Sequence, residues 1–272
     1  MRRVSRAAGE LARPAALASR AVSAARRLTI VGWHRIGPGG TGLDTPVDEF
    51  RRQLDVLAEW GAVVLSLERA TQLLAQDAVP EHAVVLTFDD GYASVAESAW
   101  PLLRDRGWPA TMFAVSGYLD GARAFPWDEG SAAANCRLLD WAGLRELADA
   151  GMDIGSHSVS HPWLPELPPQ QLDHELRSSK ACLEDGLGRA VTSFAYPTGG
   201  WDRRVRAVAD QAGYTTAVTV DRGRSRHGHD PLALRRAFAF TGQRDFRLQL
   251  DGAFDWMRPV ELYRLRRRPS WS

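Results

Sequence analysis

Two adjacent carboxylates, Asp89 and Asp90, follow a short apolar run and precede a glycine. The run, Val84-Val85-Leu86, is typical of a strand covered on both faces, and Gly91 permits the tight turn that ends it. Neighbouring carboxylates repel each other, and removing them from water costs free energy unless a cation or a proton compensates their charge. The pair therefore predicts a positive charge close to it.

Two histidines four positions apart, His157 and His161, follow another predicted strand. A carboxylate and two imidazoles are a common ligand set for catalytic zinc, which keeps open positions for water and substrate. Gly155 and Pro162 flank the histidines and favour a loop over a helix, and a loop can also bring both rings to one ion. Alone, Asp-Asp-Gly is usually a turn and His-x-x-x-His a chance pair. Together, at strand ends, they predict a metal site.

A third motif, Phe194-Ala-Tyr-Pro-Thr-Gly199, also lies at a predicted strand end, although Tyr-Pro-x-Gly alone is usually a turn. Its Tyr196 could contact a ligand through its ring, and so could Trp127 in the long loop 116–138. Packing in the core or anchoring of the loop is an equally good interpretation of these two aromatic residues.

Strands and helices alternate along most of the chain, which predicts parallel strands joined by helical crossovers. The polar motifs follow successive strands, as in a barrel, and we find no glycine-rich phosphate turn of the kind that marks an open doubly wound sheet. The predicted strands are 28–33, 63–65, 84–88, 110–115, 153–156, 193–196 and 216–220. The predicted helices are 47–60, 66–76, one that ends near 105, 144–150, 168–187, 203–212 and 246–257.

The segments Thr87–Gly91 and His157–His161 resemble the NodB-homology polysaccharide deacetylases, carbohydrate esterase family four. Three further segments agree, and Phe194–Gly199 is similar to the third motif of the poly-N-acetylglucosamine deacetylase branch. The other two are Trp33–Ile36 and Pro109–Phe113. The resemblance covers residues 28 to 239 and implies an α/β fold, a distorted (β/α)7 barrel.

We therefore divide the chain into a catalytic domain, 28–257, and two basic segments, 1–27 and 258–272. The resemblance also implies a divalent metal, usually Zn²⁺, with Asp89 as the catalytic base. It implies three metal ligands, which are Asp90, His157 and His161. It places an oxyanion-binding backbone N–H at Thr198. We expect the substrate to contact Tyr196, Pro197 and Trp127.

This sequence departs from the family pattern at two places. The arginine of the usual third motif is absent, and Arg236 is the candidate that would orient Asp89 instead. The late Leu-x-x-His that often supplies the general acid is also absent, since no histidine follows His229. His34 is our substitute candidate, although it could equally be a satisfied histidine that pins the first loop. Alternatively, Asp89 could return the proton that it has taken.

The expected reaction is metal-dependent hydrolysis of the N-acetyl group of an N-acetylhexosamine in a polysaccharide, oligosaccharide or lipid-linked glycan, with release of acetate. An O-acetyl esterase or another hydrolase of non-peptide C–N bonds is an alternative, because the same site can polarise any acyl carbonyl. A non-catalytic glycan-binding module is a third hypothesis. The intact Asp89 argues against it, because a binding module needs no base.

The net charge of +1 is distributed unevenly. Residues 1–27 carry +6 and residues 258–272 carry +4, so the remaining residues must carry −9. Basic ends on an acidic body indicate peripheral contact with an anionic membrane, although a solvated terminus is the simpler interpretation. We expect no nucleic-acid partner and leave the oligomeric state open. No signal peptide is visible, which favours a cytoplasmic location, at or near the inner membrane face.

Overall fold

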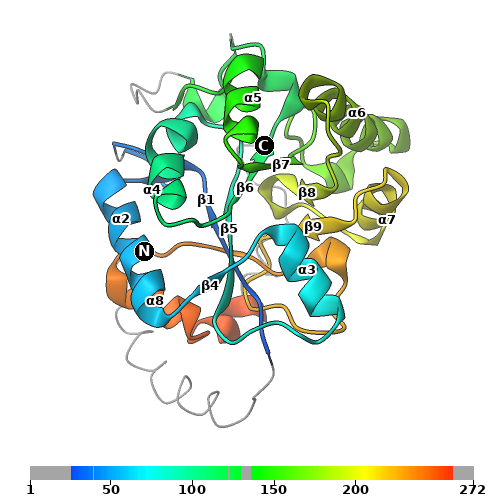
Figure 1. Ribbon diagram of the computed structural model, residues 1–272. Coiled ribbons are helices and arrows are strands. Elements are labelled where there is room, and N and C mark those ends of the chain that lie inside the picture. Colours follow the sequence, from blue (N-terminus) through cyan, green and yellow to red (C-terminus); the bar gives the residue numbers. More distant parts are fainter. Residues whose placement is uncertain (1–25, 39, 122, 130–135, 260–272) are drawn as a thin grey trace.

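A parallel sheet forms the centre of the molecule in the computed structural model, which describes residues 26–38, 40–121, 123–129 and 136–259 (Figure 1). The strand order is β10-β1-β5-β6-β7-β8-β9, and β4 pairs with the first residues of β5. The strands are β1 (Thr29–Trp33), β4 (Val63–Val64), β5 (Ala83–Phe88), β6 (Thr111–Ala114), β7 (Asp153–Ser156), β8 (Ser193–Ala195), β9 (Thr216–Val218) and β10 (Ala237–Phe238).

The sheet curls because one segment returns from its last strand to its first. Leu234 forms a parallel bridge with Val218 of β9, and Ala237 then pairs with Val31 of β1. All six residues of β5 are buried, as expected for a strand covered on both faces. This arrangement is the distorted (β/α)7 barrel predicted from the sequence.

Helices surround the sheet, and most begin at the residues that the sequence predicts. Ser66, Asp140 and Asp202 each accept a hydrogen bond from a backbone N–H of the first turn and so cap their helices. Figure 1 shows α2 and α8 side by side, with α5, α6 and α7 around the other half of the sheet. The helices are α2 (Val47–Trp60), α3 (Leu67–Ala75), α4 (Trp100–Arg104), α5 (Trp141–Asp149), α6 (Pro169–Leu187), α7 (Arg203–Gln211) and α8 (Gln243–Leu250).

The structure differs from the predicted elements in two respects. The predicted helix 246–257 begins earlier, at Gln243, and ends at Leu250, because the chain turns at Gly252 with φ of 77° before a single 3-10 turn, Asp255–Met257. The strand β10 and the small pair β2 (Arg35–Ile36) and β3 (Asp44–Thr45) were not predicted. Strands of two residues are too short to show an alternating pattern.

The predicted basic segments, 1–27 and 258–272, lie almost entirely outside the described residues. Among the helices that are described, none has the length and apolar character needed to cross a membrane.

Candidate active site

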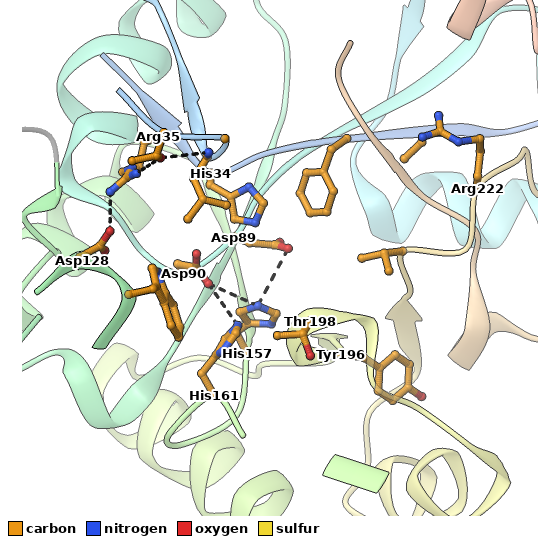
Figure 2. A pocket seen from close by; sticks show the side chains of 17 residues that line it. His34, Arg35, Asp89, Asp90, Asp128, His157, His161, Tyr196, Thr198 and Arg222 are labelled. Atoms are coloured by element: carbon orange, nitrogen blue, oxygen red, sulfur yellow. Dashed lines mark hydrogen bonds and ion pairs between the residues drawn. The ribbon is translucent and has the colours of Figure 1, made fainter. Parts of the chain in front are cut away.

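A pocket of about 690 Å³ lies at the carboxyl ends of β1, β5 and β7 (Figure 2). Parallel strands bring their carboxyl ends to one edge, so side chains that follow different strands meet there. Eight of the ten residues that the sequence singles out line this pocket, and they are His34, Asp89, Asp90, Trp127, His157, His161, Tyr196 and Thr198. The other two, Pro197 and Arg236, are buried next to lining residues.

The three predicted metal ligands converge at the bottom of the pocket. The Asp90 Oδ1 atom lies 3.5 Å from Nε2 of His157 and 3.5 Å from Nε2 of His161. The ligand atoms of all three residues lie within 4.8 Å of one another, and all three side chains are buried. Figure 2 shows both rings directed toward the carboxylate.

The chemistry of this cluster fits a divalent cation. The buried Asp90 Oδ1 accepts no hydrogen bond from any described residue, and burial together with Asp89 raises the pKa of Asp90 well above its ordinary value. Burial lowers the pKa of both His157 and His161, which favours the neutral imidazoles that bind metals. The Nδ1 atom of His157 lies 2.8 Å from the Ala195 carbonyl oxygen, a partner that fixes the ring and leaves Nε2 for a metal.

The backbone around the cluster adopts conformations that side chains rarely take. Asp90 has φ of 76°, His161 has φ of 61° and Thr198 has φ of 53°. A β-branched residue such as Thr198 is especially rare in this region, and such conformations tend to gather at functional sites. The surrounding contacts must hold these residues in place.

Glu175 of α6 supplies one such set of contacts for the loop between the two histidines. Its Oε2 atom accepts hydrogen bonds from the backbone N–H groups of Val159 (2.8 Å) and Ser160 (2.9 Å), and its Oε1 accepts one from the Ser160 hydroxyl. Sequence reasoning missed Glu175, because nothing distinguishes it from the other polar residues of its helix.

Arg236 lies against Asp89, as expected from the sequence. Its two terminal nitrogens donate to the two carboxylate oxygens at 2.6 and 2.7 Å, and the guanidinium also bonds to Thr87 and to the Thr219 carbonyl. Burial alone would raise the pKa of Asp89, but the Arg236 charge outweighs that effect and holds the pKa at about 2. Asp89 is therefore ionised at neutral pH, beside the predicted ligand Asp90.

The imidazole of His34 stacks on Phe238 with ring centroids 4.4 Å apart. Burial, with Arg236 and His157 adding to it, lowers the pKa of His34 to about 4 despite the opposing charge of Asp89. The ring is therefore neutral near pH 7. Tyr196 lines the pocket, but its hydroxyl donates to the Leu232 carbonyl, so that group is already used in the core.

The opposite side of the pocket is built from two loops that Arg35 joins. The fully buried Arg35 guanidinium contacts Asp44 Oδ1 at 2.8 Å through Nε and Asp128 Oδ1 at 2.6 Å through Nη1. The Tyr92 hydroxyl donates to the other oxygen of Asp128 at 2.6 Å. The linked loops line the pocket with Thr41, Gly42, Leu43, Trp127 and Asp128.

This network places Trp127 beside the metal-ligand cluster. Its indole stacks on Phe125 at 4.4 Å and lies 4.9 Å from the ring of His161. Sequence reasoning identified Trp127 but missed the pairing of Arg35 with Asp128, which are 93 positions apart. No periodic pattern links residues at such a separation.

Comparisons with known proteins show which sequences this chain is similar to. A family model described as polysaccharide deacetylase matches residues 76–217, a range that contains the Asp89-Asp90 pair and both histidines. YxkH of Bacillus subtilis (strain 168), provisionally named a polysaccharide deacetylase, is 29% identical over 217 residues, which are 79% of this chain and 72% of that protein. A chitooligosaccharide deacetylase of Azorhizobium caulinodans is 27% identical over 135 residues, 49% of this chain and 56% of that one.

Solved structures show the same fold. IcaB from Ammonifex degensii matches with a TM-score of 0.72 at 24% identity, covering 85% of this chain and 97% of that one. The Streptococcus pyogenes deacetylase PplD, solved in complex with acetate, matches with a TM-score of 0.69 at 24% identity, covering 90% of this chain and all of that one.

Proposed function

The chain belongs to the polysaccharide deacetylase family, whose members are hydrolases of carbon–nitrogen bonds other than peptide bonds, and we propose that it removes the N-acetyl group from an N-acetylhexosamine of a glycan. One observation carries the proposal. An ionised carboxylate, Asp89, lies directly beside the convergent ligands Asp90, His157 and His161 in a single pocket. The pocket volume is in the range that holds a sugar-sized ligand.

We propose Zn²⁺ as the metal, because two imidazoles and one carboxylate form a typical catalytic zinc set. A divalent cation bound by these residues would polarise the acetamido carbonyl and make a water molecule a better nucleophile. The protein itself supplies the fixed geometry of the ligands, through Ala195 behind His157 and Glu175 behind the loop that carries His161.

Asp89 is the proposed base. Because Arg236 keeps the carboxylate ionised and fixes both of its oxygens, Asp89 can accept the proton of the attacking water without first losing one of its own. The proposed donor to the developing oxyanion is the backbone N–H of Thr198, which lies in the pocket wall. The protonated Asp89 then returns the proton to the leaving nitrogen, and the products are acetate and a free amine.

The first test measures acetate release from N-acetylglucosamine oligomers before and after complete removal of metal, followed by addition of Zn²⁺ or another divalent cation. Loss of the base in Asp89→Asn should lower kcat by about 100- to 10,000-fold while the metal content stays unchanged. The matched control, Asp48→Asn, makes the same chemical change at an exposed position on α2 and should leave kcat unchanged.

Two outcomes would contradict the proposal. Activity that survives complete metal removal would exclude the metal mechanism. Hydrolysis of O-acetyl esters only, or glycan binding without any turnover, would exclude N-deacetylation and favour the esterase or the binding module, respectively.

A further inference from the structure

Five arginines that the proposed reaction does not use lie together beside the first strand. Leu28 and Ser225 form an antiparallel bridge, with hydrogen bonds of 2.8 and 2.9 Å in both directions, so Arg27 runs past Arg224 and Arg226. The backbone N–H of Arg235 donates to the Ser225 hydroxyl and brings a third segment alongside. Together with Arg258, these arginines form what we call the basic patch: Arg27, Arg224, Arg226, Arg235 and Arg258.

The patch has an excess of positive charge. Asp255 pairs with Arg224 at 3.1 Å, and Asp221 lies 3.7 Å from Arg258. Burial, followed by repulsion from neighbouring arginines, lowers the pKa of both Arg27 and Arg235. A cluster of cations that repel one another is stabilised when an anionic partner approaches it.

Both basic ends of the chain join the folded domain at this patch. Arg27 is the last residue of the N-terminal segment with a charge of +6, and Arg258 is the first residue of the C-terminal segment with +4. The rest of the chain carries −9, so the two segments that join the domain here supply the positive charge of an otherwise acidic chain. The C-terminal sequence also mixes its arginines with Leu262, Tyr263 and Trp271.

An exposed tryptophan borders the patch. The side chain of Trp256 is 55% exposed, and it follows Asp255, the partner of Arg224. Tryptophan beside arginine is typical of surfaces that lie at the headgroup level of a lipid bilayer, where the indole enters the interface and the guanidinium meets phosphate. Duplex DNA also presents phosphates, but its bases are stacked inside the helix and it has no apolar layer, so it would leave the exposed indole in water.

The patch also adjoins the substrate pocket. Arg222 lines the pocket and lies two residues before Arg224 in the same segment. Figure 2 shows Arg222 on the side of the pocket away from Arg35 and Asp128. A surface bound by the patch would therefore lie near one end of the pocket.

We propose that the basic patch, with Trp256, docks the protein on an anionic phospholipid membrane. This interaction is separate from the proposed deacetylation, and its partner is the lipid surface and not a soluble anion. The two basic end segments add to the attraction, and the orientation places one end of the pocket near the headgroups.

The test is co-sedimentation of the full-length protein with vesicles of phosphatidylglycerol and phosphatidylcholine in equal parts, at about 0.1 M salt. The patch variant carries Arg27→Gln, Arg226→Gln and Arg258→Gln. We expect it to bind on the order of 100-fold more weakly than the wild type, because each arginine near an anionic surface contributes about fivefold. Trp256→Ala should weaken binding by a factor that higher salt does not remove, since burial of the indole is not electrostatic.

The matched control carries Arg51→Gln, Arg69→Gln and Arg177→Gln, which remove the same charge from exposed positions on α2, α3 and α6. It should bind like the wild type, and both triple variants should keep wild-type acetate release on a soluble oligomer. An equal loss of vesicle binding in both triple variants would show that only the net charge of the protein matters. That result would overturn the basic patch as the docking surface. If the wild-type protein bound vesicles of pure phosphatidylcholine as tightly as the anionic vesicles, anionic lipid would be overturned as the partner. Tighter binding to a DNA duplex than to the anionic vesicles would overturn it as well.

Discussion

On one side of the pocket, the side chains that would do the chemistry follow the ends of β5 and β7, with His161 on the short loop after β7, whereas on the other side they come from loops distant from these strand ends. We call the first the strand-end side, formed by Asp89, Asp90, His157 and His161. The second is the loop side, formed by residues 41–43 and 127–128. Sheet hydrogen bonds fix the starting points of the strand-end side. The loop side is joined by one buried guanidinium, that of Arg35, which contacts Asp44 directly after the first loop and Asp128 in the second.

The difference indicates that the two sides of the pocket serve different purposes. The strand-end side must hold ligand atoms to within a fraction of an ångström, which rigid elements do better than loops. The loop side must fit a sugar, and loops vary without disturbing the sheet. We therefore expect variants on the strand-end side to abolish metal binding or kcat, and variants on the loop side to raise KM while the metal stays bound.

Asp90→Asn should give the largest loss on the strand-end side. The amide carries no charge, so the cluster that would hold the metal would lose its carboxylate, and we expect activity to fall by about 1,000-fold or more. Added Zn²⁺ should raise the Tm of the wild type, because it binds the folded state, and should leave the Tm of the variant unchanged. Metal analysis and thermal unfolding with and without Zn²⁺ check this. A variant that keeps a full equivalent of metal would contradict the assignment of Asp90.

Arg236→Met tests the support behind Asp89 and should cost about 100-fold in kcat/KM. Without the guanidinium, burial raises the pKa of Asp89 from about 2, so the acid limb of the pH–rate profile should move to higher pH. In the wild type the depressed pKa contributes stability above pH 4 that is lost as the pH falls toward 2. The difference in unfolding free energy between wild type and variant should therefore be largest above pH 4 and shrink toward pH 2.

Arg236→Lys is the matched variant, since it keeps the positive charge and loses the bidentate contact with Asp89. It should lie between the wild type and Arg236→Met in both activity and position of the acid limb. An acid limb that stays in place in both variants would show that Arg236 does not set the protonation of Asp89.

Arg35→Met tests the loop side and should raise KM for an oligomer by about tenfold, with kcat within a few-fold and metal content unchanged. It should also lower the free energy of unfolding by about 3–5 kcal/mol, because Asp44 and Asp128 lose a buried partner. Arg35→Lys keeps the charge but cannot hold both carboxylates in the same way, so it should rescue stability more than KM. Loss of metal in either variant would show that the two sides of the pocket are not independent.

The same contrast explains how far the sequence predicts the molecule. The alternation of apolar runs and capped helices predicts the barrel, because each βα unit leaves a local signal such as Ser66 before α3 or Gly61 after α2. The convergence of the Asp89-Asp90 pair with His157 and His161 could be predicted because strand ends meet at one edge, and the family resemblance then singled out Asp90 as the ligand. The bonds of Glu175 and the contacts of Arg35 could not, because they join segments distant in the sequence through single side chains. The helix 246–257 was predicted too long, because its apolar spacing continues past the turn at Gly252.

His34→Gln should have the smallest effect, less than about tenfold, and it decides how the leaving nitrogen receives its proton. A general acid must be protonated to act, so with a pKa of about 4 the fraction of His34 in the active form falls tenfold for each pH unit above 4. If His34 were the acid, the wild-type rate would fall from pH 5 to pH 8. If Asp89 returns the proton, the rate stays level over that range. His34→Gln then changes the rate by the same factor at every pH and leaves the shape of the pH–rate profile unchanged. A loss of 100-fold or more, with a pH dependence that disappears in the variant, would instead assign the proton transfer to His34.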